Sequence, residues 1–292
     1  MNSQEHIVPK SIKSEFLNKY APKVFADLAS KAKAKISIGK GEILVNGDKV
    51  NYDHKVFAGD KVTFSRKSNS SKVKRKIFEE KLEVLFEDDE MAVVFKPGGL
   101  AVNGNSFKTL ENALPYNLKK SNRTDALPFP RPVHRLDAPT TGLVLCAKTE
   151  KAQVSLGQQL ESKKITKRYK AVLAGRLKET TGEINSLVDK KPSTTKYKVL
   201  KSHKAHSYEY VTMVDLFPVT GRTHQLRIHM KEQHCPIIGD KLYGDEFKII
   251  NGKGLLLCSD QVEFYHPVTG ELTKVETSIP KKFEKFYQRE RK

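Results

Sequence analysis

A run of sixteen residues, 134–149, constrains the fold and chemistry of this chain more than any other segment. It opens with a histidine, an arginine, a leucine and Asp137, passes through turn-forming proline, threonine and glycine residues, and ends in the apolar stretch 143–147. Asp, Pro, Thr and Gly bend the backbone or bond to it, and a short apolar run between polar residues is typical of a buried strand. The run therefore predicts a tight turn that displays the Asp137 carboxylate beside Arg135 at the start of a rigid strand.

An aspartate in such a turn also has an ordinary structural explanation. Asp137 could simply close the turn by hydrogen bonding to its own backbone, and for an isolated Asp-x-Pro this is the more frequent role. The turn alone does not establish a catalytic site.

The complete run resembles the signature of the RluA-like family of RNA pseudouridine synthases. Further segments resemble motifs of the same family in the same order, and together they cover roughly residues 79–280. These segments are 86–100, 167–171, 220–230, 236–244 and 266–270. The resemblance implies an α+β fold with a mixed, mainly antiparallel sheet, and an enzyme that isomerises uridine to pseudouridine in RNA.

The resemblance also implies roles for three catalytic residues. Asp137 matches the family nucleophile, Arg227 the arginine that pairs with it, and Tyr169 the tyrosine that stacks on the base and assists proton transfer. An ionised carboxylate in a partly desolvated pocket needs a compensating cation, and the guanidinium fork suits a bidentate contact with it. Without the resemblance, Arg227 would be taken as a surface arginine and Tyr169 as a core residue.

Other positions of the same motifs are expected to contact RNA. Arg135 matches an arginine implicated in displacing the target base from its stack, although it could instead pack the turn or touch a phosphate. His134, Arg222 and His224 are further candidates because they lie in the matching motifs.

The charge of the chain agrees with an RNA partner. The chain has fifty-three Lys and Arg residues and thirty-four Asp and Glu residues, which gives a formal net charge of +19. Such a surface attracts polyanions, and its binding weakens as salt rises. Nucleic acid, as rRNA or tRNA, is the first expectation and an acidic membrane the second.

The chain contains no run of about 18 apolar residues that could span a membrane. Its first six residues are expected to lead into a polar helix rather than into the apolar core of a signal peptide. We therefore expect a soluble cytoplasmic protein, acting as a monomer.

Neither a metal nor a cofactor is expected. Cys146, Cys235 and Cys258 are far apart in sequence and are predicted to be reduced, buried residues. His224, His229 and His234 invite a zinc interpretation, but steps of five residues turn by about 140° around a helix, so the three would not share a face. The glycine pairs at 39/41 and 98/99 lack the spacing of a phosphate-binding loop.

Two domains joined by a basic linker are expected, with boundaries at residues 1–66, 67–78 and 79–292. The segment around the linker holds a single valine among polar and basic residues, too little apolar surface to offset the entropy of ordering. It could act as a tether that touches phosphate or could simply be solvated.

The first domain resembles the small alpha-L RNA-binding module of a ribosomal protein of the small subunit. Residues 42–50 predict a hairpin with an Asn-Gly turn, and residues 58–64 a further turn and strand. The resemblance implies a helix pair on a little sheet, with Lys31, Lys33 and Lys35 on its RNA-binding face. The serine–arginine pair that usually opens the helical half of this module is absent, and a basic domain serving only solubility or packing is the alternative.

Patterns in the second domain predict individual elements. Residues 150–163 have helical spacing, whereas 165–174 and 208–217 alternate as strands do, with Tyr169 on a face shared with residues 171 and 173. Thr223 is a candidate N-cap for a helix that ends near Gln233.

Two alternatives remain for the function. The chain could be an RNA-binding assembly factor that keeps the fold without catalysis, although binding alone needs neither Asp137, Tyr169 nor Arg227 in this arrangement. It could also be a hydrolase that uses one carboxylate and nearby histidines, but no second carboxylate stands at a defined spacing.

Overall fold

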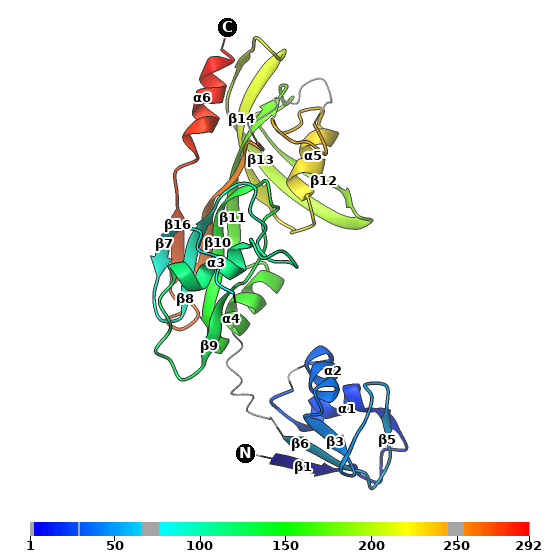
Figure 1. Cartoon of the computed structure of the whole chain (residues 1–292). Helices are drawn as coiled ribbons and strands as arrows, with labels where there is room; N and C mark the ends of the chain where they lie inside the picture. Colours follow the sequence, from blue (N-terminus) through cyan, green and yellow to red (C-terminus); the bar gives the residue numbers. More distant parts are fainter. Residues whose placement is uncertain (1–2, 29, 66–75, 245–253, 292) are drawn as a thin grey trace. The chain divides into compact units, whose positions relative to one another are not determined.

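The chain divides into two compact units, Met1–Lys74 and Arg75–Lys292, in the computed structural model (Figure 1). The structure describes residues 3–28, 30–65, 76–244 and 254–291. Residues 67–75 of the predicted linker therefore lie outside the described part. Each unit has its own apolar core and is described separately.

The first unit is a helix pair on a small sheet. Its elements are β1 (Ser3–Ile7), β2 (Glu15–Phe16), α1 (Leu17–Val24), α2 (Lys31–Gly39), β3 (Ile43–Val45), β4 (Asp48–Lys49), β5 (Lys55–Val56) and β6 (Lys61–Ser65). The sheet order is β1-β6-β3-β4, and β2 pairs with β5. The predicted hairpin is confirmed, because Asn46 and Gly47 adopt φ angles of 53° and 90° in the turn that joins β3 to β4.

The expectation that the first residues lead into a polar helix is wrong. Residues 3–7 form β1, which runs antiparallel along β6 with Ser3 opposite Ser65. The first helix begins only at Leu17. Backbone pairing with a strand sixty residues away decides the conformation here, and no local pattern in a polar hexapeptide reports such a partner.

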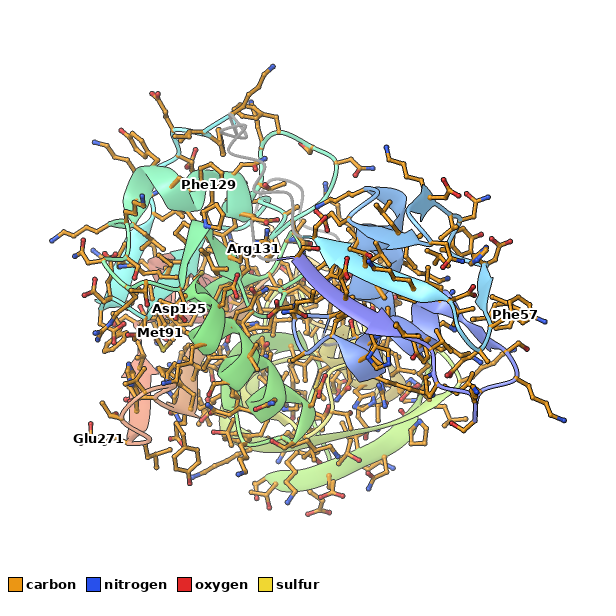
Figure 2. All side chains as sticks on the ribbon, turned by 90° about the horizontal axis from the view of Figure 1, so that it is seen from below. Phe57, Met91, Asp125, Phe129, Arg131 and Glu271 are labelled. Carbon is orange, nitrogen blue, oxygen red and sulfur yellow. The ribbon has the colours of Figure 1, made fainter. Side chains whose placement is uncertain are left out.

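Apolar side chains from both helices and the sheet close the first unit. Tyr20 and Phe25 pack with Ile38 of α2 and with Phe64 of β6. The α2 helix begins where the Ser30 hydroxyl accepts a hydrogen bond from the Lys33 amide. Phe57, in contrast, is half exposed at the edge of this unit (Figure 2).

The second unit is built on a ten-stranded sheet. Its strands are β7 (Glu83–Glu87), β8 (Met91–Lys96), β9 (Ala126–Pro132), β10 (Thr141–Thr149), β11 (Thr166–Ala174), β12 (Thr181–Val188), β13 (Lys191–Lys204), β14 (Tyr210–Pro218), β15 (Leu257–Tyr265) and β16 (Leu272–Glu276). Its helices are α3 (Leu110–Asn117), α4 (Glu150–Glu161), α5 (Gln225–Glu232) and α6 (Lys281–Arg289). The main path is β12-β13-β14-β11-β15-β10-β8-β7, while β16 pairs with β15 and β9 with β10.

Helices cover both faces of this sheet. Ala171 and Leu173 of β11 share a core cluster with Leu226 of α5, whereas Val172 lies in a cluster with Phe283 of α6. Alternate residues of a strand point to opposite faces, so α5 and α6 lie on opposite sides of the sheet (Figure 1). Alternate side chains of β10 belong to one core cluster with α3 and to another with α4. By the same argument, α3 lies on the face of the sheet that carries α5, and α4 on the face that carries α6.

One parallel contact interrupts the otherwise antiparallel pairing. Thr141 and Gly142 of β10 lie opposite Cys258 and Ser259 of β15. Gly142 has a φ of 120°, and a β-carbon on it would lie 2.2 Å from the Ser259 carbonyl oxygen. Only glycine allows this approach, which joins the strand after the Asp137 turn to the centre of the sheet.

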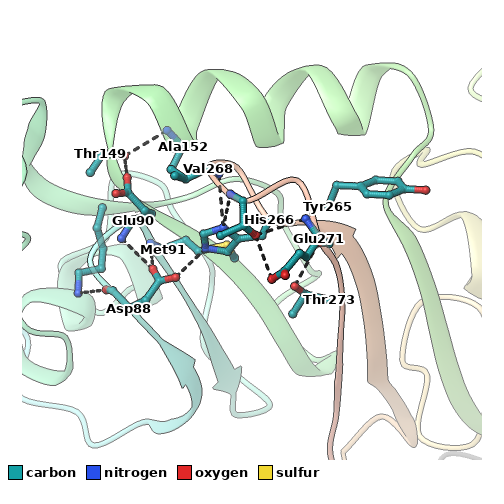
Figure 3. A network of polar contacts seen from close by, with 12 residues as sticks. Asp88, Glu90, Met91, Thr149, Ala152, Tyr265, His266, Val268, Glu271 and Thr273 are labelled. Atoms are coloured by element: carbon teal, nitrogen blue, oxygen red, sulfur yellow. Dashed lines mark hydrogen bonds and ion pairs between the residues drawn. The ribbon is translucent and has the colours of Figure 1, made fainter.

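Polar contacts tie the turn between β7 and β8 to the turn between β15 and β16 (Figure 3). The Asp88 carboxylate accepts hydrogen bonds from the amides of Glu90 and Met91 and lies 2.7 Å from Nε2 of His266. Thr149 caps α4 by accepting from the Ala152 amide, and its hydroxyl donates to Glu90. These contacts hold the sheet edge and the start of α4 together.

Most element predictions for this unit are confirmed. The predicted helix 150–163 corresponds to α4, and the predicted strands 165–174 and 208–217 correspond to β11 and β14. The three cysteines are free and buried. Among the described residues, none of the helices has the length and apolar character needed to cross a bilayer.

Candidate active site

The turn that carries Asp137 is held from both sides. The Thr140 amide donates to the Asp137 carbonyl at 3.0 Å, and the Gly99 amide donates to the Ala138 carbonyl at 2.7 Å. The fully buried Lys96 ammonium donates to three carbonyls, those of Pro97, Leu100 and Ala138. The Lys96 ammonium thereby joins the loop after β8 to the turn before β10.

Lys96 is a site residue that sequence reasoning missed. It lies in the matching segment 86–100, and nothing in the sequence of that segment predicts that its side chain reaches the Asp137 loop. Burial lowers the pKa of Lys96 to about 8, and the nearby Asp137 carboxylate opposes this shift. Lys96 therefore acts on the site by fixing the loop rather than by facing the cleft.

Arg227 contacts Asp137, but its bidentate partner is a different carboxylate. Nε and Nη2 of Arg227 each donate to Asp240 at 2.7 Å, whereas Nη1 reaches Asp137 at 3.3 Å. The expected two-pronged contact between Arg227 and Asp137 is therefore corrected to a single, longer one. Asp240, in a loop after α5, is the second carboxylate of the site.

Asp240 is buried, and every contact it makes favours its ionised form. Burial raises the pKa of Asp240, but the Arg227 guanidinium and the amides of Leu242 and Tyr243 outweigh this effect and lower it. Because its oxygens are already occupied by Arg227 and these amides, Asp240 cannot serve as a free acid or base. The sequence signal that could have found it was the matching segment 236–244, whose aspartate follows two apolar residues and a glycine.

The helix carrying Arg227 begins in an unexpected way. The N-cap is His224, in the left-handed region with a φ of 57°, so the prediction of Thr223 as N-cap is wrong. The buried Gln225 side chain fixes the start of the helix instead of an N-cap side chain. It accepts hydrogen bonds from the Thr220 hydroxyl and the Arg222 amide and donates one to strand β13. This arrangement directs His224 toward Asp137, with Nε2 3.8 Å from the carboxylate.

Tyr243 completes this side of the site. Its hydroxyl lies 3.0 Å from Nδ1 of His224, and the Arg227 guanidinium lies over its ring at 5.1 Å. Tyr243 was part of a matching segment but was not singled out from the sequence.

Tyr169 lies on β11 beside the Asp137 turn and is almost fully buried. Burial raises its pKa, and the Asp137 charge raises it further, so the phenol stays protonated at neutral pH. A neutral phenol next to a carboxylate can donate a proton or pack its ring against an apolar surface.

Several of the residues described above line one cleft of about 1020 Å³. Asp137, Tyr169 and Arg227 lie in its wall, together with all four of the other predicted RNA contacts of this unit: His134, Arg135, Arg222 and His224. Arg135 and Arg222 are exposed at this cleft. The cleft therefore presents the Asp137 carboxylate among basic groups, and Glu161 and Glu263 lie elsewhere in its lining.

His134 is placed to support the turn rather than to carry charge. Its Nε2 accepts a hydrogen bond from the Leu145 amide at 3.2 Å, so that nitrogen is unprotonated. Burial lowers the pKa of His134 well below the usual value, which agrees with a neutral ring.

The remaining predicted contacts belong to the first unit. Lys31, Lys33 and Lys35 are exposed on α2. They are a separate group from the residues of the cleft.

Within the described residues, no group of three His, Cys, Asp or Glu side chains is arranged to hold a metal. His229 contacts the Ser193 hydroxyl, and His234 is exposed beyond the end of α5. The three histidines of this region therefore have three different environments.

Known proteins similar to this chain agree on one family. A sequence model described as RNA pseudouridylate synthase matches residues 90–232. The chain is 34% identical over 257 residues to an uncharacterised RNA pseudouridine synthase, YhcT, of Bacillus subtilis, covering 82% of each protein. It is also 32% identical to ribosomal large subunit pseudouridine synthase C of Vibrio parahaemolyticus, covering 85% of this chain and 84% of the relative. This chain belongs to the RluA-like family of RNA pseudouridine synthases.

A solved structure supports the assignment. The human RNA pseudouridylate synthase domain containing 1 is 25% identical and superposes with a TM-score of 0.57, covering 69% of this chain and 84% of that one. The predicted mixed, mainly antiparallel α+β fold is thus confirmed for the pseudouridine synthase unit. Membership of this family places the chain among isomerases that act on RNA, as the sequence predicted.

Proposed function

We propose that this pseudouridine synthase converts specific uridines of structured RNA to pseudouridine with Asp137 as its nucleophile. The observation that carries the proposal is the position of the Asp137 carboxylate in the cleft, 3.3 Å from a buried arginine that a second carboxylate holds in place. The Arg227 guanidinium supplies a positive charge beside the proposed carboxylate nucleophile.

The reaction needs no redox step and no external group. The N-glycosidic bond between the sugar and N1 of the target uridine breaks, the base rotates, and a carbon–carbon bond forms between the sugar and C5. The proton lost from C5 is balanced by one taken up at N1. Asp137 forms the covalent bond that makes this exchange possible, either to the sugar or to the base. Tyr169, held neutral by burial, supports the base with its ring and assists the proton transfer.

A base inside a helix cannot reach this cleft, so the target must be extruded from its stack. Arg135 is exposed two residues before Asp137, where it can fill the space that the base leaves. His134, Arg222 and His224 are proposed to shape the surrounding RNA contact.

The names of the relatives favour ribosomal RNA as the substrate. Several proteins at least 30% identical to this chain are named ribosomal large subunit pseudouridine synthase C or D. The net charge of +19 fits any structured RNA, so transfer RNA is the second candidate. The cytoplasm is the proposed place of action, and a monomer the proposed state.

The first unit is proposed to be an alpha-L RNA-binding module. Its helix pair lies on a small sheet, with Lys31, Lys33 and Lys35 exposed along α2. The Lys35 ammonium lies 4.7 Å from the centre of the exposed Tyr52 ring, which places a cation and an aromatic surface side by side. Such pairs suit unpaired bases and the adjoining phosphates.

Nucleoside analysis tests the proposed function. Unmodified ribosomal and transfer RNA transcripts are incubated with the purified protein, digested to nucleosides and separated by chromatography. Pseudouridine amounting to one or a few nucleotides per ribosomal transcript is expected. Absence of pseudouridine from every transcript, at stoichiometric enzyme, would contradict the proposal.

A further inference from the structure

Lys167 is a further basic residue in the lining of the cleft. It lies on β11 two residues before Tyr169, and both side chains line the cleft that contains Asp137. The local irregularity in pairing with β15 skips Asp260 of the neighbouring strand, so the alternation along β11 is preserved. Lys167 and Tyr169 therefore point to the same side of the sheet.

Two of the less exposed cations in the cleft lining, Arg168 and Arg227, have carboxylate partners. Arg168 contacts Asp260 at 2.6 Å, and Arg227 contacts Asp240 at 2.7 Å. Lys167, within the part of the chain that the structure describes, forms no such ion pair, and burial is the one influence acting on its pKa. Its titratable neighbour His134 has a neutral ring and so contributes no charge of its own.

An unpaired ammonium at a partly buried position is unfavourable in the free protein. Burial lowers the pKa of Lys167 to about 8, which reflects the hydration that the ammonium has lost. A phosphate that enters the cleft would supply the missing counter-charge. The position is therefore costly without a ligand and favourable with an anionic one.

We propose that Lys167 binds a backbone phosphate next to the target uridine and so positions the nucleotide over Asp137 and Tyr169. This inference rests on the proposed function, because it assumes an RNA strand in the cleft. A lysine is a compact point charge with three donors, and it suits a phosphate oxygen better than the edge of a particular base. Lys167 thus contributes to RNA affinity at the reacting nucleotide without contributing to sequence choice.

The test compares Lys167→Met with Lys167→Arg and a control, Lys164→Met. Lys164 is exposed just before β11 and does not line the cleft. For Lys167→Met we expect the KM for RNA to rise about tenfold, as for loss of one charge-assisted hydrogen bond, with kcat within about twofold of the wild type. The slope of log affinity against log salt should fall by about one, whereas Lys167→Arg and Lys164→Met keep it.

Thermal stability separates a binding role from a structural one. Removing an uncompensated charge should leave the Tm of Lys167→Met unchanged or raise it. A lowered Tm together with a lowered kcat and an unchanged salt slope would assign Lys167 to the structure and overturn the proposal. So would an unchanged KM and salt slope in a variant of an active enzyme.

The binding measurement remains decisive if the enzyme proves inactive on every RNA. In that case the proposed function fails by itself, and the salt slope of RNA binding still shows whether Lys167 contacts a phosphate. A slope equal to that of the wild type would then reject the phosphate contact.

Discussion

At the scale of single residues, the site is organised around one arginine shared by two carboxylates. Nε and Nη2 of Arg227 each donate a hydrogen bond to Asp240 at 2.7 Å, and Nη1 donates one to Asp137 at 3.3 Å. Asp240 therefore positions the arginine, and Asp137 is held by a single, longer contact. Lys96 performs a comparable task for the backbone by holding the carbonyl next to Asp137.

Asp240→Asn tests this division of roles. The variant removes the negative charge of Asp240 and leaves the buried Arg227 charge without its closest partner. We therefore expect a loss of about 3 kcal/mol or more in the free energy of unfolding at pH 7. Activity should also fall, because Arg227 is freed to close on Asp137. Denaturant unfolding and steady-state rates measure the two effects.

The pH dependence of stability provides a second measurement of the same pair. The pKa of Asp240 is lowered in the folded protein, so its contribution is present above the ordinary aspartate pKa and is lost as pH falls through the lowered value. The Asp240→Asn variant should lack this loss of folding stability at acid pH. Wild-type and variant unfolding curves that stay parallel between pH 7 and pH 3 would contradict the assignment.

The family motifs grouped Asp137, Tyr169 and Arg227, and the structure places all three in the wall of one cleft, whereas their catalytic roles stay predictions. Sequence alone could not predict which of two carboxylates Arg227 would hold, because that choice depends on side-chain reach in three dimensions. The N-cap at Thr223 was wrong for a similar reason. The buried Gln225 side chain, bonded to β13, determines where α5 begins.

At the scale of elements, the parallel contact between β10 and β15 joins the strand after the Asp137 turn to the centre of the sheet. Gly142→Ala would place a β-carbon 2.2 Å from the Ser259 carbonyl in a region of φ that side chains rarely adopt. We expect a loss of roughly 3 kcal/mol or more in stability, with reduced activity, because β10 must move away from β15.

Gly157→Ala is the matched control for this substitution. Gly157 lies in α4, and a β-carbon there meets nothing within 4 Å. Alanine favours helix over glycine by about 1 kcal/mol, so this variant should be as stable as the wild type or more so. Equal melting temperatures for the two variants would refute the steric explanation.

Elements with a regular pattern were predictable, and elements defined by distant pairing were not. The alternation of β11 and the spacing of α4 report which residues are buried on each face. β1 has no such pattern, since it is a polar edge strand and only its partner β6 defines it.

At the scale of the whole molecule, the two units have separate cores, so removing residues 1–74 should leave a folded second unit. We expect weaker RNA binding with a shallower salt dependence, and a kcat on a short RNA present in excess that stays close to that of the full chain. Filter binding across a salt series measures the first effect. Unchanged affinity at every salt concentration would show that the first unit does not hold RNA.

The most direct test of the central claim is tritium release from RNA labelled at C5 of uridine, with wild type compared with Asp137→Asn. Formation of the new carbon bond expels that hydrogen, so release reports the isomerisation itself. We expect release by the wild type and none by the variant, which should bind RNA as tightly as the wild type does. Release by a pure preparation of Asp137→Asn would contradict the assignment of Asp137 as the nucleophile.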